Sequence, residues 1–138
     1  VEIAQPENAI PAGIPKDQIR RVAILFSPGL EQARKAFVVF IDESARTIAK
    51  KPLYLRKVLS EPFDEGTDEE ALIERVRVAR GAAVLGVLEG VPEARLRDLG
   101  AKFARAGMVF KDIAAADVDK RAVAVDIVVD LMLLAPET

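Results

Sequence analysis

The sequence predicts an α/β fold with three layers: a mainly parallel, open sheet of four to five strands covered by at least three helices. Short apolar runs alternate along the chain with longer segments in which apolar residues recur every three or four positions. This alternation is typical of βαβ units. We therefore expect a single α/β domain of βαβαβαβ order over 19–138, preceded by an extended, proline-containing lead-in over 1–18.

Four segments are predicted as strands. Residues 21–26 and 82–88 are almost entirely apolar, which is typical of strands buried on both faces. Residues 53–60 alternate leucines with other side chains, which indicates a half-solvated strand at an edge of the sheet. Residues 108–110 form a short fourth strand.

Three helices are predicted between these strands, over 30–50, 67–81 and 92–107. The second has the clearest start signal, because Thr67 and Glu70 have the spacing of a capping box. Glycines close the second and third helices, as they close many helices.

The last apolar segment, residues 122–134, fits two structures. Every odd position from 123 to 133 holds a large apolar residue, and many are β-branched, so we expect a strand. The alternative is a helix with Asp126 and Asp130 on one face.

The amino-acid composition excludes several kinds of catalytic and metal-binding chemistry. The chain has no histidine and no cysteine, which excludes a thiolate nucleophile, a histidine base, a disulfide framework and an ordinary zinc site. A net charge of −2 gives no basic surface for nucleic acid. We expect a domain that is not an enzyme, with no cofactor and no metal, although an acid-based hydrolase built on Asp126 and Asp130 stays open.

A weak candidate site lies at the carboxyl ends of the buried strands, where open α/β sheets bind ligands. No glycine-rich nucleotide loop is present. The crevice would lie between Ser27-Pro28-Gly29 and Glu89-Gly90-Val91, so Ser27, Gly29, Glu89 and Gly90 are the candidate ligand-binding residues, for a small anion at a helix end. Ordinary turn and cap chemistry explains the same residue types.

The sequence contains more apolar residues than are needed to cover one face of the sheet. Val38 and Val39 widen the stripe of the first helix, and 122–134 adds more apolar surface. The expected function is therefore a non-catalytic binding or assembly domain that contacts a protein partner or a second copy of itself. The alternative is a small anionic-ligand binder, or a degenerate enzyme, that uses the crevice.

The alternation as a whole is Rossmann-like. From Arg21 to Val91, the order of buried strand, serine-containing turn, long helix and second strand resembles the opening lobe of bilobed periplasmic solute-binding proteins. No apolar run has the roughly 18 residues of a membrane span. The chain starts at Val1, and we expect an exported protein rather than a cytoplasmic one.

Overall fold

The computed structural model, which describes residues 10–134, contains a four-stranded, all-parallel sheet in the order β2-β1-β3-β4. This confirms the predicted α/β fold and its mainly parallel sheet. The strands are β1 (Ile19–Phe26), β2 (Tyr54–Pro62), β3 (Ala83–Val87) and β4 (Val109–Ile113).

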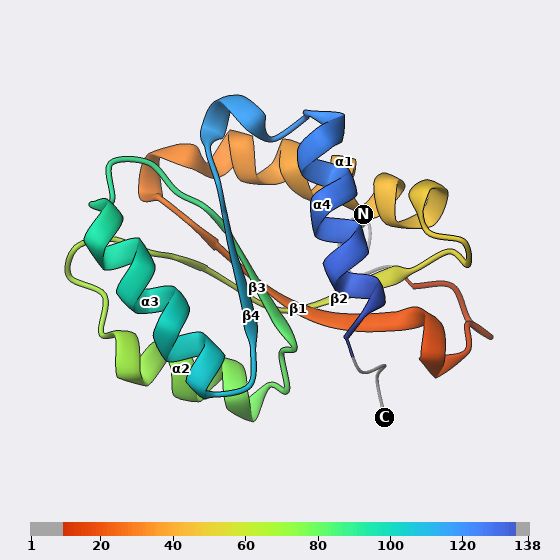
Figure 1. Cartoon of the computed structure of the whole chain (residues 1–138), viewed down its shortest axis with the longest axis horizontal. Helices are drawn as coiled ribbons and strands as arrows, with labels where there is room; N and C mark the ends of the chain where they lie inside the picture. The colour runs from red at the N-terminus through yellow and green to blue at the C-terminus, as the bar shows by residue number, and fades with distance from the viewer. Residues whose placement is uncertain (1–9, 135–138) are drawn as a thin grey trace, which may run out of the picture.

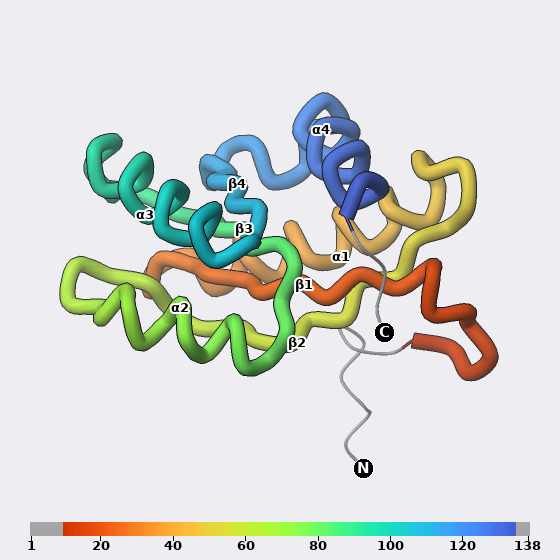
Figure 2. Tube along the Cα trace, turned by 60° about the horizontal axis from the view of Figure 1, so that its bottom comes forward, coloured from red at the N-terminus to blue at the C-terminus, as the bar shows by residue number. Residues whose placement is uncertain are grey.

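Helices cover both faces of the sheet, which gives the predicted three layers (Figure 1). On one face lie α1 (Glu31–Ile48) and α4 (Arg121–Met132). On the other lie α2 (Glu69–Val78) and α3 (Glu93–Arg105). Figure 2 shows the trace of α4 running past α1, and the two helices are in contact.

The central strand β1 is buried on both faces, as its apolar sequence predicts. Val22 and Ile24 pack in the cluster under α1 and α4, whereas Ala23 and Leu25 pack in the cluster under α2 and α3. β1 is therefore shared by both cores, and its carboxyl end is held rigidly between them.

The edge strand β2 contains a buried charge, Lys57, on the same face as Leu55. The register shifts between Val22, which pairs with Lys57, and Ala23, which pairs with Leu59. This bulge leaves Val58 as the extra residue. Lys57 is buried, and its Nζ lies 2.8 Å from both carboxylate oxygens of Asp42 on α1.

The strand expected over 122–134 is wrong: residues 121–132 form α4. The buried residues of α4 follow helical spacing, namely Ala124, Ile127, Val128 and Leu131. These four close the core above α1, so burial overrides the β-branched preference of the local sequence.

Half of the lead-in expected over 1–18, residues 1–9, lies outside the described residues. Within the described part, Lys16–Gln18 form a single 3-10 turn directly before β1. Between residues 10 and 134, no helix is both long enough and apolar enough to span a membrane.

Candidate functional site

A pocket of about 590 Å³ opens at the carboxyl ends of β1, β2 and β3. Three of the four predicted ligand-binding residues, Ser27, Glu89 and Gly90, line it. The complete lining is Ser27, Pro28, Phe63, Asp64, Glu65, Glu89, Gly90, Val91, Pro92 and Arg95. Its volume lies within the range of about 300 to 1,000 Å³ that is typical of small-molecule sites.

The pocket sits where the chain changes direction across the sheet. β1 and β3 are neighbours, with Phe26 beside Val87 at their carboxyl ends. After β1 the chain enters α1 on one face, and after β3 it enters α3 on the opposite face. The two connections diverge at this point, which is the general ligand position in open α/β sheets.

Ser27 joins the two loops that the sequence predicts as the crevice. Its Oγ accepts a hydrogen bond from the Glu89 N–H at 2.9 Å and donates to the Glu89 carbonyl at 3.3 Å. The side chain makes no capping hydrogen bond to the helical turn that follows it. The Ser27 hydroxyl therefore stabilises the floor of the pocket, and its hydrogen-bonding capacity is largely used within the protein.

The two predicted glycines occupy different places. Gly90 lines the pocket at φ +72°, a left-handed conformation that disfavours other residues. Gly29 lies in the 3-10 turn Pro28–Leu30 that leads into α1, and it is not among the lining residues.

The wall that the sequence does not predict is the β2–α2 turn, residues 63–67. The Thr67 hydroxyl accepts the Asp64 N–H at 2.9 Å, and Asp64 Oδ1 accepts the Gly66 N–H at 2.9 Å. Because Thr67 is engaged within the turn, the expected capping box is wrong. Asp68 caps α2 instead, by accepting the Ala71 N–H at 3.2 Å.

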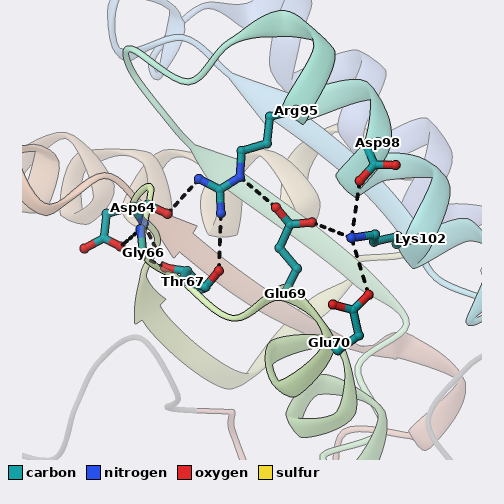
Figure 3. Close-up of polar contacts among 8 residues, drawn as sticks. All are labelled: Asp64, Gly66, Thr67, Glu69, Glu70, Arg95, Asp98 and Lys102. Atoms are coloured by element: carbon teal, nitrogen blue, oxygen red, sulfur yellow. Dashed lines mark hydrogen bonds and ion pairs between the residues drawn. The ribbon is translucent and has the colours of Figure 1, made fainter.

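Arg95 reaches from the first turn of α3 to this β2–α2 turn (Figure 3). Its Nη1 donates to the Asp64 carbonyl at 2.8 Å, and its Nη2 to the Thr67 carbonyl at 3.3 Å. Its Nε donates to Glu69 Oε2 at 2.7 Å. The guanidinium carbon also lies 4.5 Å from the centroid of the Phe63 ring, a cation–π distance.

Glu69 is the shared acceptor at the start of α2. Burial raises the pKa of its carboxyl, but hydrogen bonds from Arg95 and Lys102 outweigh that effect and hold the pKa below its usual value. Lys102 Nζ lies 2.9 Å from Glu69 Oε1 and 3.3 Å from both Glu70 and Asp98. The Glu69 carboxylate therefore stays ionised at neutral pH and orients Arg95.

The charge of the lining is predominantly negative. Asp64, Glu65 and Glu89 contribute carboxylates, and Arg95 is the one basic residue of the lining. The charge of Arg95 is already satisfied by the Glu69 carboxylate and two carbonyl oxygens. The lining therefore holds three acidic residues against one basic residue.

The lining residues that the sequence does not predict are Phe63, Asp64, Glu65, Pro92 and Arg95. The first three follow β2, and the carboxyl ends of parallel strands meet at one edge of the sheet, so this rule could have located them. Arg95 carries no such signal, because its position depends on how far a long side chain extends from α3.

Val38 and Val39, the two predicted interaction residues, differ in their exposure to solvent. Val38 is 1% exposed and belongs to the core, whereas Val39 is 70% exposed. Further exposed apolar side chains lie on or directly after α4: Val125, Val129, Met132 and Leu133.

Asp126 and Asp130, which the sequence pairs as candidate acids, both contact the Nζ of Lys111 on β4. The Asp126 contact measures 3.0 Å. The hydrogen bond to Asp130 is the main cause of a raised pKa of Lys111, which burial opposes. The two carboxylates thus form an ion-pair cluster at the sheet edge.

Comparison with models of known protein families and with curated proteins found no match to this chain. The pocket and the exposed side chains are therefore the grounds on which its function is inferred.

Proposed function

We propose that this domain binds a small molecule in the pocket at the carboxyl ends of β1, β2 and β3, without transforming it. The single observation that carries the proposal is the coincidence of a pocket of about 590 Å³ with the point where the β1 and β3 connections diverge. Absence of histidine and cysteine from the chain supports binding over catalysis.

The charges support a positively charged ligand, in place of the anion expected from the helix ends. A helix start carries only about half a positive charge. Three acidic residues line the pocket, and of these only Asp64 accepts hydrogen bonds within its own turn, whereas the Ser27 hydroxyl and the Arg95 guanidinium are both engaged within the protein. We therefore propose a ligand with an amine or another cationic group, and with an apolar part that packs on Pro28 and Val91.

Three five-carbon compounds of matched length test the charge preference: 1,5-diaminopentane, 1,5-pentanediol and glutarate. Titration calorimetry at low ionic strength is expected to show binding in the order diamine, diol, glutarate, because only the diamine complements the carboxylates. Tightest binding of glutarate would contradict the cationic ligand, and binding of none of the three would count against a small-molecule site.

The Glu89 carboxylate is expected to contribute directly to binding of the diamine. Glu89→Gln should weaken 1,5-diaminopentane about three- to fivefold, the size of one exposed charge interaction. Glu43→Gln is the matched control, because Glu43 is exposed on α1 and is not among the lining residues. Equal effects of the two substitutions would show that net charge alone attracts the diamine.

A second candidate is assembly through the outer face of α4. Its specific support is the exposed set at 36–80%: Val125, Val129, Met132 and Leu133. Two of the sequence features that favoured assembly do not hold in the structure. Val38 is buried, and the terminal segment is not a strand that could pair with another chain. This candidate therefore ranks below ligand binding.

Sedimentation velocity at micromolar to millimolar concentration tests assembly. If the α4 face self-associates, Val129→Glu is expected to convert a concentration-dependent sedimentation coefficient into that of a monomer, because a charge would be buried at the contact. Val78→Glu is the control, since Val78 is 68% exposed on α2 at the opposite face. A wild-type chain that stays monomeric at every concentration would rule out self-association through the α4 face.

A further inference from the structure

We propose that Arg95 is the positioning residue of the pocket: it holds the β2–α2 turn at a fixed distance from α3 and thereby sets the width of the opening. This inference rests on the proposed function for its relevance to ligand binding. Its structural content, the dependence of the turn on one side chain, can be tested without any ligand.

The β2–α2 turn has few attachments to the rest of the protein. Its first residue, Phe63, is buried and donates its N–H to the Phe26 carbonyl at 2.8 Å. Beyond Phe63, the hydrogen bonds of Asp64, Gly66 and Thr67 close within the turn, apart from those that Arg95 makes. Within residues 10–134, no other side chain from outside the turn hydrogen-bonds to residues 64–67.

Arg95 connects two walls of the same pocket. It belongs to the first turn of α3, where its own N–H donates to the Pro92 carbonyl at 3.0 Å. Val91 and Pro92 line the pocket from the β3–α3 loop, and Asp64 and Glu65 line it from the β2–α2 turn. The side chain therefore spans the distance between the walls, as the close-up in Figure 3 shows for its contacts with Asp64 and Thr67.

The contact geometry requires a guanidinium. The planar fork directs Nη1 and Nη2 at two different carbonyls while Nε donates to Glu69 and one face lies on the Phe63 ring. A lysine ammonium in the same place has the charge but lacks the rigid fork, so it cannot hold these acceptors together. Glu69 also binds Lys102, through the carboxylate oxygen that Arg95 does not use.

The positioning role and a purely electrostatic role predict opposite changes in diamine affinity when Arg95 is removed. If Arg95 acted only as a positive charge in a pocket for cations, removing it would strengthen binding of a diamine. If Arg95 holds the wall that carries Asp64 and Glu65, removing it lets these carboxylates move away and weakens the same ligand.

The first measurement is hydrogen–deuterium exchange of the free protein and three variants: Arg95→Lys, Arg95→Gln and Lys102→Gln. Exchange in residues 64–68 is expected to be about tenfold faster in both Arg95 variants, with β1 and β3 unchanged, because local opening is independent of global unfolding. Lys102→Gln is the control, since Lys102 binds Glu69 but does not touch the turn. Its turn should exchange like that of wild type.

The second measurement is the affinity for 1,5-diaminopentane by calorimetry. Arg95→Gln and Arg95→Lys are both expected to bind it about five- to tenfold more weakly than wild type, a loss comparable to one ordinary hydrogen bond. Unchanged exchange of the turn in both Arg95 variants would overturn the proposal, and so would tighter binding by Arg95→Gln. A wild-type protein that does not bind the diamine, while the turn still loosens on losing Arg95, would refute the proposed function and leave the positioning role in place.

Discussion

Val128→Asp is expected to lower the free energy of unfolding by about 3 kcal/mol or more, because it places a charge in the core without a partner. Val128 is 0% exposed in α4 and packs in the cluster shared with α1 and β1. The neighbouring change Val129→Asp should cost no more than about 0.5 kcal/mol, as is usual for surface positions. Val129 is 47% exposed. Urea denaturation followed by circular dichroism measures both.

This pair of variants separates the two structures that the sequence allows for the last segment. In a strand, 127, 129 and 131 would share the buried face, and 128 would point to the other side. In α4, residues 127, 128 and 131 are buried together. A larger loss from Val129→Asp than from Val128→Asp would therefore contradict the helix.

Asp42→Ala is expected to destabilise the protein by about 3 to 5 kcal/mol, because it removes the carboxylate that balances a buried ammonium. The side chains of Lys57 and Asp42 are only 4% and 16% exposed, and their atoms lie 2.8 Å apart. The measurement is again the free energy of unfolding in urea. Glu74→Ala is the control, because it breaks an ion pair with Arg77 in which both side chains are exposed, and it should cause no measurable change.

A double variant shows whether the loss comes from the remaining charge. Asp42→Leu combined with Lys57→Met removes both charges and keeps the volume, so it should recover most of the stability that Asp42→Ala loses. Equal losses in the single and double variants would show that packing, rather than the buried ammonium, explains the effect.

The order of strands and helices was predictable because each element except the last has a single consistent pattern. In 122–134 two periods overlap, since Val123, Ile127 and Leu131 fit both alternation and helical spacing. Only the need to cover the sheet above α1 decides between them, and that requirement is tertiary.

Two walls of the pocket were predictable from the rule that connections diverge at the switch between β1 and β3. The role of Ser27 was not, because its partners on Glu89 are backbone groups 62 positions away in the chain. The same holds for Arg95, which reaches carbonyls of a turn that precedes it by 31 and 28 positions. Long side chains that bond to distant backbone groups leave no periodic signal in a sequence.

Hydropathy patterns also do not predict which charged residues are buried. Arg34 and Lys57 are both buried, although charged residues are normally assigned to the solvent face. Lys57 lies two residues after Leu55 on the α1 side of β2, where it binds Asp42. Arg34 lies under the end of β1, with its guanidinium carbon 5.2 Å from the Phe26 ring centroid.

The most direct test of ligand binding at this pocket is chemical-shift mapping by NMR of the ¹⁵N-labelled protein titrated with 1,5-diaminopentane. Saturable shifts are expected for the amides of Ser27, Glu65, Glu89 and Gly90, which line the pocket from three separate loops. The amide of Val129 on α4 should not move. Saturable shifts confined to α4, or none at all at the carboxyl ends of the strands, would contradict a ligand site there.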